Sequence, residues 1–299
     1  MLARMQALHV FQILNHYTSR QELDPGFAVL DNSANERPDW FEYWPIRRYL
    51  QSEALDENAF YGFLSPKFRL KTNLTSAGLR EFVDAAPPAD VILFSPSIQN
   101  SAYYLNVFEH GDAEHPGLMG TAACLFQRIG RPRALEGLVS DSRNTVHSNY
   151  FIAKPRFWRT WLGVTEALYA IAEAPDDPLG KELRAPTSYR GKANVQMKIF
   201  IMERIATWII STDRSFVACA RDPFVARSRI YKLPVAIICD ALKIAYVAEG
   251  RPQYKEVFLL VSGLRKNLNF HLRAGDWLGL QRVRPYLRSL RSYWREGER

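Results

Sequence analysis

Short apolar runs alternate with helix-like segments over residues 10–210, and this order restricts the fold more than any other feature of the sequence. The runs at residues 10–15, 59–64 and 90–94 have the length and composition of buried strands. Between them lie segments in which apolar residues recur at helical spacing. This alternation predicts an α/β protein with helices packed against a sheet.

The C-terminal part of the sequence has a different character. From residue 231 to residue 299 the pattern is helical throughout, with helices predicted at 234–247, 253–265 and 276–295. We therefore expect a sheet-containing domain at residues 1–230, followed by a helical basic segment at 231–299.

The net charge of +8 comes mostly from residues 265–299, where Lys and Arg outnumber Asp and Glu. Such a segment could attract anionic phospholipids, nucleic acid or a phosphorylated substrate. Tryptophan and tyrosine between the arginines favour an anionic membrane surface. No nucleic-acid-binding motif accompanies the charge, so nucleic acid is not an expected partner. The competing interpretation is that the apolar residues of this segment pack on the domain and only its arginines face solvent.

The remaining composition predicts a cytoplasmic protein. Cys124, Cys219 and Cys239 lie far apart in apolar sequence, which predicts buried free thiols and neither a disulfide nor a metal site. Residues 1–10 lack the apolar run and the cleavage site of a signal peptide. Together with the basic segment, these features predict a cytoplasmic protein that contacts the inner face of the cytoplasmic membrane peripherally.

Residues 31–68 combine an Asn-rich loop, a group of aromatic residues and a Gly-containing strand. A strand predicted at 26–30 puts Asp31 and Asn32 at its carboxyl end, where α/β folds bind ligands. Aromatic rings such as that of Trp44 offer flat apolar faces to a sugar or a nucleobase. Ordinary core packing is the competing explanation for these rings.

Three groups of charged residues are candidates for chemistry. Residues 109–115 (EHGDAEH) are predicted to form a polar loop that holds a divalent cation or furnishes a base, or else a solvated loop. Glu203 faces the apolar side of a helix predicted at 192–210, where it needs a partner such as an arginine. Lys67–Thr72 has a basic residue at every second position and could clamp a diphosphate, or form an exposed basic edge.

Six motifs follow one another within residues 9–212: DNSAN, FEYW, YGFLSPKF, DVIL, NYFIAKP and MERI. Their order resembles bacterial glycosyltransferases of the GT-A, or nucleotide-diphospho-sugar transferase, fold from capsule, lipopolysaccharide and exopolysaccharide biosynthesis. The resemblance implies a Rossmann-like mixed sheet flanked by helices. It also implies transfer of a sugar from a nucleotide-diphosphate donor to a glycan or lipid-linked acceptor. The alternative is a non-catalytic protein that binds a glycan or a lipid-linked precursor on a degenerate scaffold of the same kind.

The charged clusters and the resemblance together define the candidate site. The candidate catalytic residues are Glu109, Asp112 and Glu203. The candidate substrate-binding residues are Asp31, Asn32, Asn35, Glu42, Trp44, Lys67, Ser95, Asn149 and Lys154.

The metal requirement stays open at this point. Enzymes of the resembled group often bind Mn²⁺ or Mg²⁺ through an Asp-x-Asp motif after a strand, but Ser95 and Pro96 follow DVILF here. Either the ligands come from Asp112, Glu114 and His115, or the transferase acts without a metal, or the site is degenerate.

Overall fold

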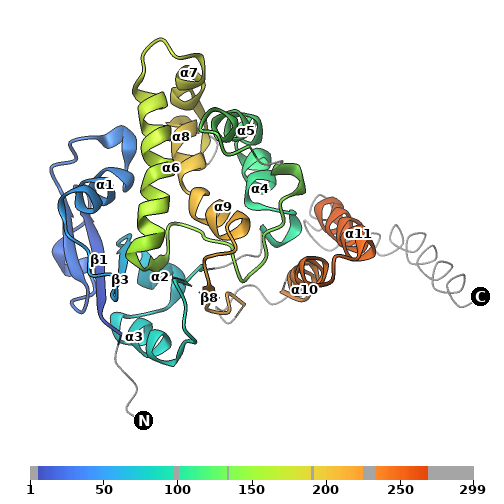
Figure 1. Cartoon of the computed structure of the whole chain (residues 1–299), viewed down its shortest axis with the longest axis horizontal. Coiled ribbons are helices and arrows are strands. Elements are labelled where there is room, and N and C mark those ends of the chain that lie inside the picture. The colour runs from blue at the N-terminus through green and yellow to red at the C-terminus, as the bar shows by residue number, and fades with distance from the viewer. Residues whose placement is uncertain (1–5, 97–100, 133–134, 190–191, 225–232, 269–299) are drawn as a thin grey trace, which may run out of the picture.

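The computed structural model describes residues 6–96, 101–132, 135–189, 192–224 and 233–268. It has an α/β architecture, with helices on both faces of a six-stranded mixed sheet (Figure 1). A mixed sheet flanked by helices is therefore confirmed. In the order β2-β1-β3-β5-β4-β8, the strands are β2 (Ala28–Asn32), β1 (Leu8–Asn15), β3 (Phe60–Leu64), β5 (Phe151–Ala153), β4 (Val91–Leu93) and β8 (Ala218–Ala220).

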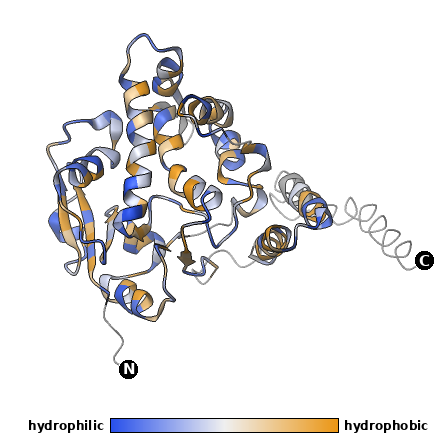
Figure 2. Cartoon of the chain, in the orientation of Figure 1, coloured by the Kyte–Doolittle hydropathy of each residue, from blue (hydrophilic) through white to orange (hydrophobic). Residues whose placement is uncertain are grey.

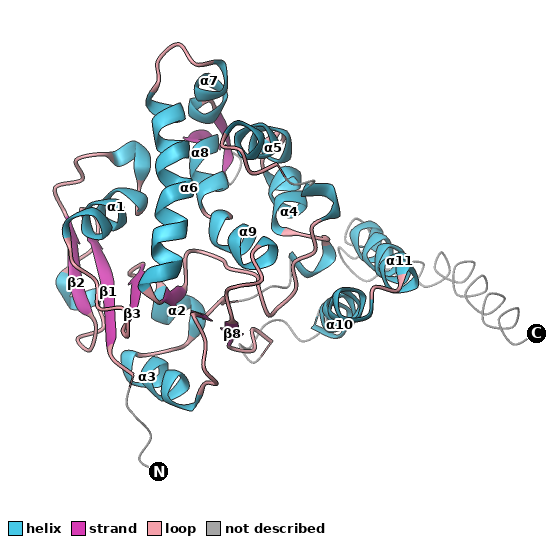
Figure 3. Cartoon of the chain, viewed as in Figure 1, coloured by secondary structure: helices cyan, strands magenta, loops and turns pink. Residues whose placement is uncertain are grey.

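One antiparallel strand divides the sheet into two parallel groups. β1 lies between β2 and β3 and pairs in parallel with both (Figure 3). β4 pairs in parallel with β8, whereas β5 is antiparallel to β3 and β4. The carboxyl ends of β1 to β4 therefore meet at one edge of the sheet, where β5 begins. Gly62 allows the close pairing of β3 with β5, because a Cβ there would lie 2.5 Å from Cγ2 of Ile152.

Side chains of the strands alternate between two hydrophobic clusters, as the period of a strand requires. Tyr61 and Phe63 of β3 belong to the larger cluster, and Phe60 and Leu64 belong to the smaller one. The larger cluster is covered mainly by α1 (Tyr43–Ser52), α5 (Leu118–Arg128), α6 (Pro155–Glu173), α8 (Met197–Met202) and α9 (Ile205–Thr212), and the smaller one by α2 (Phe68–Thr72) and α3 (Ser76–Ala85).

The polar loop predicted at residues 109–115 is largely helical, because α4 spans Val107–Glu114. The Asn106 side chain starts this helix by accepting hydrogen bonds from the backbone of Phe108 and Glu109. Gly111 lies within α4, where a Cβ would come 2.5 Å from Nε of Arg204. The glycine therefore serves close packing, and the polar composition of this segment reflects capping and solvent exposure.

Residues 176–210 also differ from the prediction. The polar sequence at residues 176–191, rich in proline and glycine, predicts a loop, but it contains α7 (Pro178–Arg184) and β6 (Pro186–Tyr189). The expected single helix begins instead as β7 (Lys192–Gln196), which pairs with β6, and is interrupted at Glu203 between α8 and α9. The apolar residues at 192–196 are spaced in a way that suits a helix or a strand, and hydrogen-bonded pairing with β6 makes them a strand.

The C-terminal helices α10 (Leu233–Glu249) and α11 (Pro252–Leu268) confirm two of the three helices predicted there. They pack against the short 3₁₀ helix η3 (Ser101–Tyr103) around a third hydrophobic cluster, which includes Cys239 and Phe258. The helix predicted at 276–295 and the domain boundary predicted at residue 230 lie outside the described residues. Short 3₁₀ turns complete the described elements at Arg20–Glu22 (η1), Pro38–Trp40 (η2) and Leu135–Gly137 (η4).

The three cysteines differ in their exposure to solvent. Cys239 is buried as predicted, whereas Cys219 on β8 is only half-buried and Cys124 is exposed on the outer side of α5. Within the described ranges, no helix is both long enough and apolar enough to cross a bilayer.

Candidate functional site

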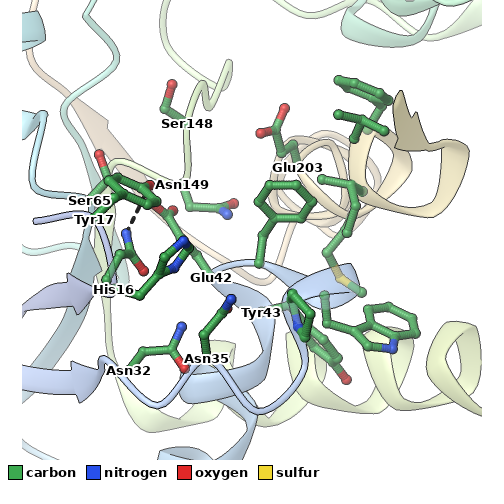
Figure 4. Close-up of a pocket in the computed structure, with 18 of the residues that line it drawn as sticks. His16, Tyr17, Asn32, Asn35, Glu42, Tyr43, Ser65, Ser148, Asn149 and Glu203 are labelled. Atoms are coloured by element: carbon green, nitrogen blue, oxygen red, sulfur yellow. Dashed lines mark hydrogen bonds between the residues drawn. The ribbon is translucent and has the colours of Figure 1, made fainter. Parts of the chain in front are cut away.

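A cavity of about 610 Å³ lies at the edge of the sheet where the parallel strands end. Asn15 and Asn32 are the last residues of β1 and β2, and Ser65 directly follows β3; all three line the cavity. Figure 4 shows Asn32 and Asn35 together in one part of the cavity, with Ser148 and Glu203 in another. Carboxyl ends of adjacent parallel strands are the usual ligand-binding edge of an α/β sheet.

Unusual backbone conformations gather around this cavity. Of the five described non-glycine residues with positive φ, four line it: Asn35, Phe41, Ser148 and Asn149. Phe41 has a φ of 48°, which is rare for a bulky residue. Because such conformations persist only where the surrounding structure fixes them, their clustering favours a functional role for this part of the molecule.

Two carboxylates face the cavity from different helices. Glu42 immediately precedes α1, and Glu203 immediately follows α8. Burial and the negative charge of Glu203 raise the pKa of Glu42 to about 7, although Lys71 and Lys67 oppose the shift. Burial also raises the pKa of Glu203, against the charges of Arg204 and Lys71. The pair can therefore keep one proton near neutral pH, as interacting carboxyl groups do.

Lys71 brings a cation to the same cavity. Its Nζ donates a hydrogen bond to Oγ of Ser148 at 3.0 Å and lies 5.5 Å from the centroid of the Tyr150 ring. Ser148 stands next to Asn149, so Lys71 also ties the β5 entry loop to α2. A lysine in this position can interact with a negatively charged part of a ligand.

Two polar atoms around the cavity have no hydrogen-bond partner among the described residues. They are Oδ1 of Asn149 and Nε1 of Trp161, and both are buried. Buried polar atoms are nearly always hydrogen-bonded in folded proteins. An acceptor and a donor are thus both present at the cavity for a polar ligand.

An ion pair between buried Lys198 and half-buried Asp39 supports the aromatic wall of the cavity. Lys198 is 1% exposed and donates to Oδ2 of Asp39 at 2.7 Å. Its Nζ also lies 3.9 Å from the centroid of the Trp40 ring, which lines the cavity. On the other side of this wall, Arg37 binds Asp39 and Glu173 with distances of 3.0 Å and 2.8 Å. Burial lowers the pKa of Lys198, and Asp39 opposes this shift.

Ser95 positions the loop that supplies part of the cavity wall. Its Oγ donates to the carbonyl of Thr145 at 2.6 Å and accepts from the backbone N–H of His147 at 3.2 Å. The loop that runs on to Ser148 and Asn149 is thereby attached to the carboxyl end of β4. Ser95 itself is buried and does not line the cavity.

The structure brings together five of the residues that the sequence proposed: Asn32, Asn35, Glu42, Asn149 and Glu203. The other proposed substrate-binding residues lie elsewhere. Asp31 accepts a hydrogen bond from the Ser33 backbone and lines a second hollow between β2 and α1; Asn32 borders both this hollow and the cavity. The Trp44 Nε1–H donates to Glu36 outside the cavity.

Lys67 and Lys154 are also outside the cavity lining, for different reasons. Lys67 precedes α2, and it is Lys71, one helical turn later, that reaches the cavity. Lys154 follows β5, which runs antiparallel to its neighbours, so it lies at the opposite edge of the sheet from Asn149.

Glu109 and Asp112 serve the ends of helices and are not brought to the cavity. Glu109 accepts from the Leu105 backbone at 2.7 Å, and Asp112 accepts from the backbone of Gly117 and Met119 at the start of α5. Such carboxylates satisfy the free N–H groups at helix starts and favour the helix dipole.

The proposed metal ligands do not form a metal site. Glu114 is exposed, whereas the buried His115 ring stacks on Phe200 with centroids 3.6 Å apart. The portion of the chain that the structure describes contains no cluster of three or more His, Cys, Asp or Glu side chains able to hold a metal ion. Asp112, Glu114 and His115 do not converge on one point in this arrangement, and no chemical step is assigned to a metal here.

Several cavity residues were missing from the sequence-based set: Asn15, His16, Tyr17, Ser65 and Ser148. The first three stand at the carboxyl end of the first predicted strand, so the rule that selected Asn32 also applies to them. Tyr17 accepts a hydrogen bond from Asn15 Nδ2 at 3.1 Å. Lys71 belongs to the basic stretch at residues 67–72 that could clamp a diphosphate, and it lines the cavity. Tyr43 belongs to the aromatic group of residues 31–68 and lines the cavity, whereas no sequence signal marks Ser148, which reaches the cavity through tertiary packing.

Comparison of the chain with family models, with curated proteins and with solved structures found no match.

Proposed function

We propose that this protein is a glycosyltransferase that moves a sugar from a nucleotide-diphosphate donor to a glycan or lipid-linked acceptor in bacterial surface polysaccharide synthesis. The observation that carries the proposal is the pair Glu42 and Glu203, two carboxylates with raised pKa in one cavity at the carboxyl ends of parallel strands. Carboxyl groups tuned toward neutral pH are typical of acid–base catalysis. The GT-A-like form of the mixed sheet and a position at the inner face of the membrane are parts of the same proposal.

In the proposed reaction, Glu203 is the general base. It takes the proton from the acceptor hydroxyl while that oxygen forms a bond to the anomeric carbon, and the bond from this carbon to the diphosphate breaks. Burial raises the pKa of Glu203, which makes it a stronger base than an exposed carboxylate. A single displacement of this kind inverts the anomeric configuration.

The other cavity groups have supporting roles in this proposal. Glu42, which retains a proton up to about pH 7, can donate a hydrogen bond to a sugar hydroxyl. Lys71 offers the positive charge that a departing diphosphate requires. The amides of Asn15, Asn32 and Asn149 can orient hydroxyl groups or a nucleobase.

A glycan-binding protein without catalysis is the second candidate. Asparagine amides beside aromatic rings such as Trp40 and Tyr43 are a lining that binds sugars without reacting with them. Binding of nucleotide-sugars would not be required in this case, and release of a nucleoside diphosphate would not occur.

One experiment separates the two functions. The full-length protein is screened by thermal shift against nucleoside diphosphates and their sugars, with and without Mn²⁺, and donors that stabilise it are then assayed for release of the nucleoside diphosphate. Stabilisation by one nucleotide class, with release that disappears in Glu203→Gln, is the expected result. Stabilisation by oligosaccharides alone would favour the binding protein, and no stabilisation by either class would contradict both.

A further inference from the structure

Two exposed aromatic side chains lie at the cavity. Most hydrophobic residues of the described chain lie in the strands and in the helices that cover them (Figure 2). Among the Phe, Tyr and Trp side chains that the structure describes, only Tyr17 and Phe41 are exposed, by 65% and 49%. Both line the cavity that holds Glu42 and Glu203. Single exposed hydrophobic residues are common on proteins, but two exposed aromatic rings at one cavity point to a ligand.

The backbone of Phe41 is strained. Phe41 has a φ of 48° and a ψ of −130°, and Glu42 follows with a φ of −69° and a ψ of −19°. A type II′ turn has central angles of about 60° and −120°, then about −80° and 0°, and glycine normally takes its first central position. The Cβ of phenylalanine crowds the backbone in this conformation. The turn itself needs only a positive φ, which glycine supplies, so what phenylalanine adds is its ring.

The residues on either side of Phe41 are packed, whereas its own ring is not. Trp40 is fully buried, and its ring centroid lies 5.2 Å from that of Tyr43. Phe41 belongs to none of the three hydrophobic clusters, and its ring makes no ring–ring or cation–π contact with the residues that the structure describes. Core packing therefore does not explain why a phenylalanine occupies the strained position. Backbone strain of this kind is typical of ligand-binding sites.

We infer that Phe41 binds a sugar ring of the acceptor glycan by stacking. One face of a pyranose presents a patch of C–H groups. The negative face of an aromatic ring attracts their partial positive charge, and both apolar surfaces leave water on contact. The inference rests on the proposed function for the identity of the ligand, and it also applies if the protein binds a glycan without catalysis.

The size of the cavity favours the acceptor over the donor as the ligand of Phe41. A cavity of about 610 Å³ is within the range of about 300–1,000 Å³ that encloses a small ligand such as a nucleotide-sugar. A glycan chain is longer and has to extend past the exposed residues of the cavity lining. Tyr17, whose hydroxyl accepts a hydrogen bond from Nδ2 of Asn15 at 3.1 Å, is a second ring of this kind. A nucleobase also stacks on aromatic rings and is the competing ligand.

The test is saturation-transfer NMR of the full-length protein, titrated with methyl glycosides of the common hexoses, 6-deoxyhexoses and N-acetylhexosamines. Nucleoside diphosphates are titrated in parallel. Phe41→Tyr keeps a flat ring, whereas Phe41→Leu keeps an apolar side chain without one. The control, Val217→Ser, changes an apolar residue that is 54% exposed and does not line the cavity. We expect Phe41→Leu alone among these variants to bind the glycoside at least about fivefold more weakly than the wild type, with nucleoside diphosphate affinity unchanged.

Phe41→Gly adds a measurement that a purely structural role would not explain. Glycine adopts the turn without strain and has no ring. The midpoint of urea unfolding should therefore stay at or above that of the wild type, while glycoside affinity falls as in Phe41→Leu. A lower midpoint in both Phe41→Gly and Phe41→Leu would show that the ring supports the fold, and would overturn the inference.

The other outcomes separate this inference from the proposed function. Equal glycoside affinity in Phe41→Tyr and Phe41→Leu would contradict stacking. Weaker nucleoside diphosphate binding in Phe41→Leu, with unchanged glycoside binding, would assign the ring to a nucleobase instead. Release of the nucleoside diphosphate without binding of any glycoside would overturn the inference and leave the proposed function standing. Glycoside binding that depends on the ring, without nucleotide binding, would support the inference and favour the glycan-binding protein.

Discussion

Glu42 and Glu203 reach one cavity from the start of α1 and the end of α8, and the charge of Glu203 helps to raise the pKa of Glu42 to about 7. The two residues are far apart in the sequence, and each lies at a helix terminus beside the carboxyl ends of the parallel strands. Their proximity makes the protonation of one depend on that of the other.

The first prediction is a fall in stability with rising pH that is caused by Glu42. The pKa of this group is about 7 in the folded chain and 4.5 at its ordinary value, so between these pH values only the unfolded chain ionises it. Stability is therefore highest below pH 4.5 for this contribution and is lost as pH rises to about 7. The loss should be no more than about 3 kcal/mol.

Urea unfolding at pH 5 and pH 8 measures this effect. Glu42→Gln should show a smaller decrease between the two pH values than the wild type, and should be at least as stable at pH 8. Glu53→Gln, at the exposed C-terminal end of α1, controls for the loss of one negative charge. An unchanged pH dependence in Glu42→Gln would contradict the prediction.

The second prediction concerns Glu203 as the base of the proposed transfer. Glu203→Gln keeps the size of the side chain and removes its ability to accept the proton, so turnover should fall by about 10²-fold to 10⁴-fold. Affinity for the donor, measured by calorimetry, should change little, since a base acts mainly in the transition state. Glu109→Gln serves as the comparison, and a larger loss in that variant would move the base away from this cavity.

The sequence predicts the sheet better than it predicts the site. Strands at residues 10–15, 59–64 and 90–94 are found within about two residues, because their apolar runs are bounded by turn residues. β8 is three half-buried residues long and has no comparable run. Residues 192–196 have apolar spacing that suits a helix, and only the pairing with β6 makes them a strand.

Some of the cavity residues can be predicted from the sequence with rules that need only neighbouring residues. Asn32 is found because ligands bind at the ends of parallel strands. Asn149 and Lys154 look equivalent in the sequence, but the antiparallel direction of β5 separates them to opposite edges of the sheet. The direction of a strand depends on long-range pairing, which no local pattern encodes. The carboxylates at 109 and 112 attract attention by composition, whereas their hydrogen bonds serve helix ends.

The third prediction separates Asp31 from its neighbour Asn32. Asn32 lines the cavity, whereas Asp31 is half-exposed and bound to the Ser33 backbone. Asn32→Ala should weaken binding of the nucleotide ligand by about tenfold, the value of one hydrogen bond at about 1 kcal/mol or slightly more. Asp31→Ala should leave the affinity unchanged. Calorimetric titration of both variants measures these affinities. Equal losses of affinity in the two variants would show that the ligand extends beyond this cavity.

The fourth prediction compares two lysines on one helical turn. Lys71 lines the cavity and Lys67 does not, so Lys71→Met should weaken nucleoside diphosphate binding by at least tenfold while Lys67→Met has a small effect. The loss in Lys71→Met should be greatest at low ionic strength, because salt screens the attraction between the exposed Lys71 ammonium and the diphosphate. Greater loss in Lys67→Met at every salt concentration would reverse the assignment.

The last prediction tests the support of the aromatic wall by Lys198. Lys198→Met preserves the apolar stem of the side chain but removes the charge that pairs with Asp39 and lies over Trp40. Removing one member of a fully buried ion pair costs about 3–5 kcal/mol, but Asp39 is 35% exposed and still binds Arg37, so we expect about 1–2 kcal/mol here.

Urea unfolding gives the free energy, and the control is Arg48→Met. Arg48 pairs with Glu36 on the surface, where both side chains are more than half exposed, so its loss should cost less than about 1 kcal/mol. Trp40 fluorescence should also change in Lys198→Met, since the cation leaves its ring. Because Trp40 lines the cavity, ligand affinity should fall in the same variant and not in the control. Equal stability and equal affinity in the two variants would show that the wall does not depend on Lys198.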